Sequence, residues 1–202
     1  MFPLGSVLLP GALLPLHVFE PRYRQLVVDC LREDGVPEFG QTLITHGHET
    51  GGGDERADVG TVARMLQVEA LDDGRYAVVA VGTRRIRVNA WLADDPYPRA
   101  DVDDWPDVDP EPDGLELQVT AAHARVRATL ALAAEAGAAP VDLTEHEIAA
   151  DPLLATYHLA SLAPIGPADR FRLLTAPGPL RRLDVLDEVL DDVEAMLRFR
   201  LS

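Results

Sequence analysis

The chain has 202 residues, a length that suits one or two domains. Hydrophobic residues make up 47% of it and charged residues 26%, as in a folded globular protein. Its 34 acidic and 18 basic residues give a formal charge of −16, which disfavours binding to nucleic acid or to an anionic membrane. Every basic residue is arginine, so these residues contain no lysine-dependent phosphate-binding loop and no Ser–Lys catalytic dyad.

The first 19 residues carry no charged side chain but contain three prolines that interrupt any helix. No basic residue precedes the apolar run, so we interpret it as buried extended chain, with strands over 7–10 and 13–19, and not as a signal peptide. The single cysteine, Cys30, provides no internal disulfide and agrees with a reducing compartment. We therefore expect a cytoplasmic protein that does not associate with membranes.

The next segments follow the patterns of one helix and several strands. A helix is expected from Pro21 to about Leu31, because proline suits the first helical position and apolar residues then recur at helical spacing. Period-two alternation and a turn at Asp72-Asp73-Gly74 predict strands over 39–45, 59–71, 76–81, 85–92 and, at an edge, 96–101. This succession predicts a small, curved, mostly antiparallel barrel.

The composition changes between Asp94 and Glu116, where ten acidic residues and five prolines accompany one arginine. Like charges and prolines favour an extended, solvated connector, which we place at 106–116. Apolar residues then recur at helical spacing, with helices expected from Leu115, Pro152 and Pro167 and over the C-terminal residues. We thus expect an α+β chain with a β-rich unit at 1–105 and a helical bundle at 117–202.

Several separate motifs resemble those of one family, the substrate-binding domain found at the N-terminus of the ATP-dependent Lon protease. They stand in the same order over nearly the whole chain. The matching residues are Phe2-Pro3-Leu4, Pro10-Gly11, Pro15-Leu16-His17, Phe19-Glu20-Pro21-Arg22-Tyr23, Val59-Gly60-Thr61-Val62-Ala63, Asp73-Gly74-Arg75-Tyr76, Gly82 and Arg85.

The resemblance implies a PUA-like antiparallel pseudo-barrel with one helix, followed by a helix bundle, and it extends to the Lon-like part of cereblon, a protein-interaction scaffold. It implies a structural role for the motif residues Pro10, Gly11, Glu20, Pro21, Arg22, Tyr23, Gly60, Asp73, Gly74, Gly82 and Arg85. The residues present hold neither the ATPase nor the protease part of Lon. We therefore expect a non-catalytic module. Describing it as a peptidase would only transfer to it an activity of the Lon protease whose catalytic residues it lacks.

Three classes of function remain open. The favoured one is recognition of unfolded or extended polypeptide in a groove between barrel and helices, with or without a separate protease or ATPase as a further partner. The candidate binding residues are the apolar side chains of the N-terminal stretch, Phe2, Leu4, Leu13, Leu14 and Phe19. The alternatives are a small-ligand-binding protein or enzyme with a pocket in the barrel, and RNA recognition by analogy with PUA domains, which the charge disfavours.

Two polar clusters have competing interpretations. His46 and His48 begin an acidic, glycine-rich loop and are weak candidates for a metal site, although such loops are usually only solvated, and we expect no metal and no cofactor. The run 84–87 is the one dense basic segment, which could receive an anion or pair with the chain's excess acids. Ile86, Val88, Ala90 and Leu92 alternate as core residues, so we expect Arg85 on the opposite face as an architectural residue.

Overall fold

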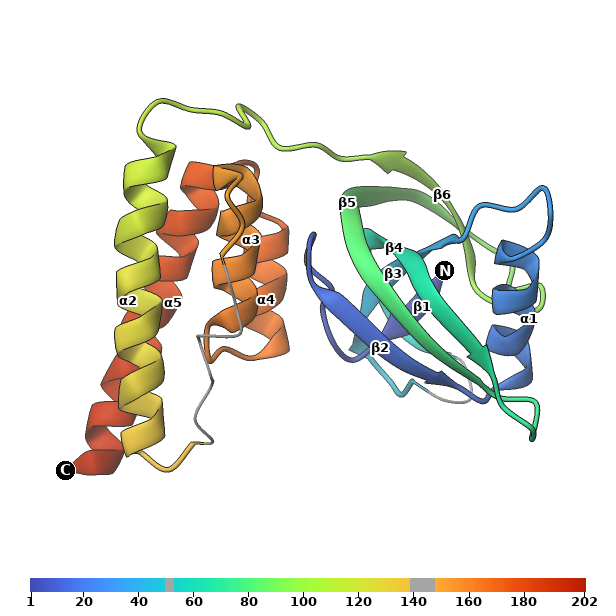
Figure 1. Cartoon of the computed structure of the whole chain (residues 1–202), viewed down its shortest axis with the longest axis horizontal. Helices are drawn as coiled ribbons and strands as arrows, with labels where there is room; N and C mark the ends of the chain where they lie inside the picture. Colours follow the sequence, from blue (N-terminus) through green and yellow to red (C-terminus); the bar gives the residue numbers. More distant parts are fainter. Residues whose placement is uncertain (50–52, 139–147) are drawn as a thin grey trace. The chain divides into compact units, whose positions relative to one another are not determined.

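The computed structural model describes residues 1–49, 53–138 and 148–202, and among these residues it contains six strands and five helices (Figure 1). The chain divides into two compact units, Met1–Pro106 and Asp107–Ser202. The first unit holds the strands and one helix, and the second holds the other helices. The fold is thus α+β, as the sequence predicts.

A single mixed sheet forms the first unit. Its elements are β1 (Phe2–Leu4), β2 (Leu13–Val18), α1 (Pro21–Cys30), β3 (Glu38–His46), β4 (Glu55–Ala70), β5 (Tyr76–Leu92) and β6 (Arg99–Asp104). The strand order is β1-β3-β4-β5-β2, and β6 pairs with the far half of β5. All these pairs are antiparallel except β1 with β3, in agreement with the expectation of a mostly antiparallel arrangement. That pair is parallel because β2 and α1 lie between its strands and supply the long connection it needs.

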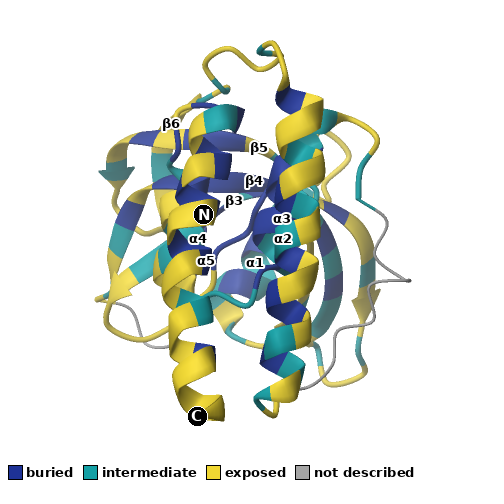
Figure 2. Ribbon diagram, turned by 90° about the vertical axis from the view of Figure 1, so that its left-hand side faces the viewer, coloured by how far each residue is buried: buried dark blue, intermediate teal, exposed yellow. Residues whose placement is uncertain are grey.

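In its described residues the second unit is a bundle of four helices, α2 (Leu115–Glu135), α3 (Pro152–Leu162), α4 (Pro167–Leu174) and α5 (Pro179–Leu201). Three of them begin with proline, whose missing N–H has no partner at a helix start in any case. Apolar side chains repeat along one face of α2 and of α5, and Figure 2 shows these faces buried. Val126 and Leu190 are fully enclosed, which confirms the helical spacing seen in the sequence.

Residues 7–10 do not form the expected strand, although Leu8 and Leu9 are buried. Side chains of the sheet form hydrogen bonds with the backbone N–H and C=O groups of this loop, which therefore needs no neighbouring strand. The Gln41 amide accepts from the Leu8 N–H at 3.1 Å and donates to the Ser6 carbonyl at 2.7 Å, while the Thr61 hydroxyl donates to the Leu8 carbonyl at 2.7 Å. These partners lie far away in sequence, so local patterns could not reveal them.

Arg85 is buried, with 3% of its surface exposed, and so does not lie on an open polar face. Trp105 covers this face, with its ring centroid 4.4 Å from the guanidinium carbon of Arg85 and 4.5 Å from that of Arg87. The backbone N–H of Trp105 also donates to the Arg85 carbonyl at 2.9 Å. Ala90 and Leu92 are exposed rather than in the core, because β4 pairs with β5 only as far as Arg87.

The start of the acidic segment 106–116 is held tightly by the helical unit. The Asp107 carboxylate forms an ion pair with Arg182 and accepts from the Tyr157 hydroxyl at 2.8 Å. The next N–H, that of Val108, donates to the Pro177 carbonyl at 2.8 Å. The Asp107 carboxylate is therefore buried and not solvated, because a buried arginine supplies its partner, whereas Val108 is 69% exposed.

Candidate functional site

The structure divides the five apolar candidates of the N-terminal stretch into two groups. Phe2 and Leu4 are core residues, only 7% and 9% exposed, because β1 lies against β3 and α1. Leu14 is half-buried and packs against the same core. Leu13 and Phe19 are 65% and 56% exposed. Phe2 and Leu4 are therefore mainly core residues, whereas Leu13 and Phe19 remain accessible at the two ends of β2.

A hollow of about 210 Å³ lies beside β2. It brings together residues from β1, from β2 and from the start of α1, so two of the buried candidates form part of its wall. The lining residues are Phe2, Leu4, Pro15, Leu16, His17, Val18, Phe19, Glu20, Tyr23 and Glu49. Most of these belong to the motifs quoted from the sequence, which shows that the motifs converge in space.

Aromatic and charged groups pack closely in and beside the wall of this hollow. The rings of Phe2 and Tyr23 stack with centroids 4.0 Å apart and planes 7° from parallel. The Arg22 guanidinium carbon lies 4.5 Å from the Tyr23 ring centroid, and its Nε donates to the Glu20 carboxylate at 3.0 Å. Burial raises the pKa of the Tyr23 phenol to about 12, so it stays neutral at physiological pH. The wall thus offers an apolar surface with a paired charge at its rim.

A second hollow, of about 400 Å³, also borders β2. It is lined by Pro15, Leu16, His17, Gln67, Glu69, Ala77, Val78 and Val79. It shares Pro15, Leu16 and His17 with the first hollow, so that β2 separates the two. His17 is exposed between them. No sequence pattern indicated the second hollow, since it combines residues of β2, β4 and β5 that are distant in the chain.

Among the described residues, no three His, Cys, Asp or Glu side chains gather in a way that could hold a metal ion. His46 ends β3 and His48 follows it in an exposed turn. Nearby carboxylates have other partners: Glu49 accepts from the Gly5 N–H at 2.6 Å, and Asp54 pairs with Arg56 at 2.6 Å. Residues 50–52 of this loop lie outside the described part of the chain.

The basic run 84–87 pairs largely with the rest of its own unit. Arg84 forms ion pairs with Glu38 and with Asp104, each at 2.9 Å. The hydrogen bond that Arg84 donates lowers the pKa of the Glu38 carboxyl, and Arg64 acts in the same direction. Arg85 and Arg87 flank Trp105, as described above. At Arg84 the structure thus agrees with the interpretation that the run pairs with acidic residues of the same chain.

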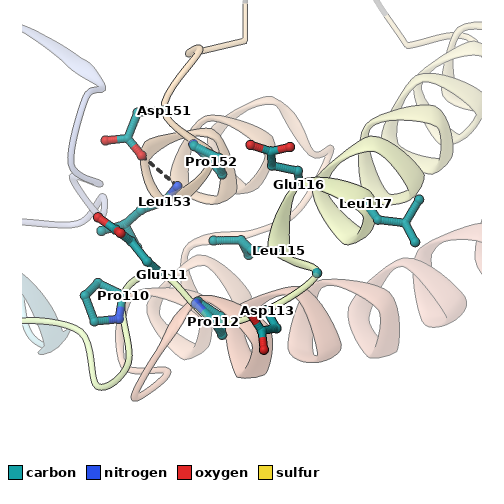
Figure 3. Close-up of a pocket in the computed structure, with 11 residues that line it drawn as sticks. Pro110, Glu111, Pro112, Asp113, Leu115, Glu116, Leu117, Asp151, Pro152 and Leu153 are labelled. Atoms are coloured by element: carbon teal, nitrogen blue, oxygen red, sulfur yellow. Dashed lines mark hydrogen bonds between the residues drawn. The ribbon is translucent and has the colours of Figure 1, made fainter.

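The helical unit has a hollow of its own, of about 640 Å³, at the starts of α2 and α3 (Figure 3). Leu115, Leu117 and Leu153 line it together with carboxylates from Glu111, Asp113, Glu116 and Asp151. Asp151 caps α3, its carboxylate accepting from the Leu153 N–H at 2.9 Å. Acidic residues are favoured at helix starts by the helix dipole, so the fold by itself accounts for much of this charge.

The described helices include none that combines the length and the apolar character needed to cross a membrane.

Comparisons with known proteins agree with this architecture. The family of the ATP-dependent protease La (LON) substrate-binding domain matches residues 1–192. A Lon N-terminal domain protein from Xanthomonas campestris is 32% identical, with a TM-score of 0.65 over 92% of this chain and 94% of that one. The N-terminal domain of the Lon protease of the Mycobacterium avium complex shares the fold at 20% identity, with a TM-score of 0.61 over 94% of this chain and 97% of that one.

Among curated proteins, Lon protease 2 of Syntrophobacter fumaroxidans is 25% identical over 180 residues, which are 86% of this chain and 21% of that protein. The chain thus spans about one fifth of the length of this relative, and 12% of the Lon protease 2 of Myxococcus xanthus. The family match covers both structural units, and one of the solved relatives is similar in sequence as well as in fold. On this evidence the chain belongs to the family of the Lon substrate-binding domain.

Proposed function

We propose that this chain recognises unfolded or extended polypeptide through the surface around β2. The observation that carries the proposal is the exposure of Leu13 and Phe19 at the two ends of β2, with the two hollows between them. Exposed apolar side chains beside a hollow are typical of surfaces that bind other molecules. The name of the matched family, a substrate-binding domain, supports the same function.

Variants of the two exposed side chains test this proposal. We expect the double substitution Leu13→Ser with Phe19→Ser to weaken binding of a permanently unfolded polypeptide by at least about tenfold, because two apolar anchors are lost. Reduced and alkylated lysozyme is a suitable probe, and fluorescence anisotropy measures its affinity.

The helical unit offers a matched control. Leu117 and Phe199 are 76% and 82% exposed, so Leu117→Ser with Phe199→Ser removes the same two residue types from another surface. This control is expected to bind like the wild type. Equal losses in both double variants, or no loss in either, would contradict the assignment to β2.

The proposal includes the absence of ATPase and peptidase activity from these 202 residues. They contain no lysine for a phosphate-binding loop, and their three serines, Ser6, Ser161 and Ser202, stand outside any nucleophile motif. We expect highly purified protein to hydrolyse neither ATP nor a casein-type substrate. Activity that co-purifies with the chain through several columns, in proportion to its amount, would show the opposite.

A further inference from the structure

β2 is an edge strand. Among the residues that the structure describes, it stands last in the strand order and pairs with β5 along one side only. Leu13, Pro15 and His17 are all exposed, so their outer side is accessible. An edge of this kind presents unpaired backbone N–H and C=O groups that can pair with another extended chain.

The pairing register shows which backbone groups face outward. The Gly82 N–H donates to the Ala12 carbonyl at 2.9 Å, immediately before the first paired residues of β2 and β5, Leu13 and Val81. In an antiparallel ladder, hydrogen-bonded and non-hydrogen-bonded pairs alternate. Leu13, Pro15 and His17 are therefore at the non-hydrogen-bonded positions, where N–H and C=O turn away from β5. Within the described residues, no hydrogen bond to these outward groups is found.

Pro15 interrupts this outer edge, because proline has no N–H to offer. The sheet tolerates proline at this position because the backbone nitrogen of Pro15 faces away from β5, so no hydrogen bond between the two strands is lost. Prolines in edge strands generally occupy such positions. The edge consequently offers donors at Leu13 and His17 and acceptors at all three residues. A partner strand meets one gap, opposite Pro15.

We propose that an extended polypeptide segment adds to β2 as a strand, held by Leu13 and His17, and that Pro15 limits its affinity and fixes its register. This inference rests on the proposed function and specifies how the same surface would bind. Side chains of an added strand alternate between the two faces of the sheet, and the two hollows share the residues Pro15, Leu16 and His17 on β2.

The charge of the surface indicates the side chains that the segment carries. The ionised groups lining the two hollows are the carboxylates of Glu20, Glu49 and Glu69, and no arginine is among the described lining residues. Arg22 neutralises only Glu20 directly. An apolar segment with a neighbouring lysine or arginine complements this surface better than an acidic one.

Amide hydrogen exchange of the wild-type chain tests the mode of binding. Without polypeptide, the outward N–H groups of Leu13 and His17 should exchange quickly, while those of Leu14 and Leu16, bonded to β5, exchange slowly. Saturation with reduced and alkylated lysozyme should slow exchange at Leu13 and His17 by at least about tenfold, as expected when a new hydrogen bond forms. Binding that leaves both exchange rates unchanged overturns this inference but not the proposed function, whereas no binding overturns both.

A variant tests the role of Pro15 separately. Pro15→Val restores the missing donor and should tighten binding about two- to tenfold, the value of one additional hydrogen bond. Pro110→Val, at an exposed proline of the helical unit, is the control and should bind like the wild type. Unchanged or weaker binding by Pro15→Val, with native circular dichroism, overturns the role assigned to Pro15.

Discussion

Replacing Asp107 by alanine is expected to lower the free energy of unfolding of the helical unit by about 3–5 kcal/mol. Asp107 pairs with Arg182, whose side chain is fully enclosed. The same guanidinium donates to the Thr156 hydroxyl at 2.8 Å and to the Tyr157 hydroxyl at 2.7 Å, and lies 3.6 Å from the Tyr157 ring centroid. Without Asp107 the arginine keeps its neutral partners but loses the charge that balances it in a dry interior.

Urea unfolding followed by far-UV circular dichroism measures this loss, since most helical residues belong to this unit. Asp187→Ala is the control, because Asp187 pairs with Arg125 at 3.0 Å while 57% of its side chain is exposed, and it should cost at most about 1 kcal/mol. Replacing both members of the buried ion pair by apolar residues, Asp107→Leu with Arg182→Met, should restore much of the stability that Asp107→Ala loses, because no unpaired charge is then left in the interior. Equal effects of Asp107→Ala and Asp187→Ala would contradict the network.

Gly60→Ala is expected to lower the free energy of unfolding of the first unit by about 1–3 kcal/mol. A Cβ atom at Gly60 would lie 2.2 Å from the backbone carbonyl oxygen of Gln41, so the paired strands β3 and β4 would have to separate. This close approach explains why glycine stands at this position of the family motif.

Thermal unfolding followed by tryptophan fluorescence reports on this unit, because Trp91 and Trp105 both belong to it. Gly5→Ala is the matched control: its Cβ would meet only the flexible carboxylate of Glu49, at 3.1 Å, and stability should change little. A Gly60→Ala variant as stable as Gly5→Ala would show that the strands can move apart at no cost.

Features set by neighbouring residues were predictable from the sequence. Pro21, Pro152 and Pro167 mark helix starts because proline acts on its own backbone, and α1, α3 and α4 begin at these residues. The turn at Asp73-Gly74 likewise separates β4 from β5. In each case the signal and its consequence lie within a few residues.

Features set by distant partners were not predictable. Asp107 looked like one more solvated acid, and only its contact with Arg182, 75 residues away, shows that it is buried. The loop 7–10 depends on Gln41 and Thr61 in the same way. The two hollows beside β2 depend on the strand order, which no local pattern specifies.

The most direct test of polypeptide recognition is a titration of the wild-type chain with an unfolded polypeptide and, separately, with a single-stranded RNA, each at low and high salt. Apolar contact and backbone pairing predict polypeptide binding of about micromolar affinity or weaker, with only a modest dependence on salt from the carboxylates beside β2. The charge of −16 predicts no comparable RNA binding. Tight RNA binding that falls steeply with salt, or no polypeptide binding at any concentration, would contradict the account.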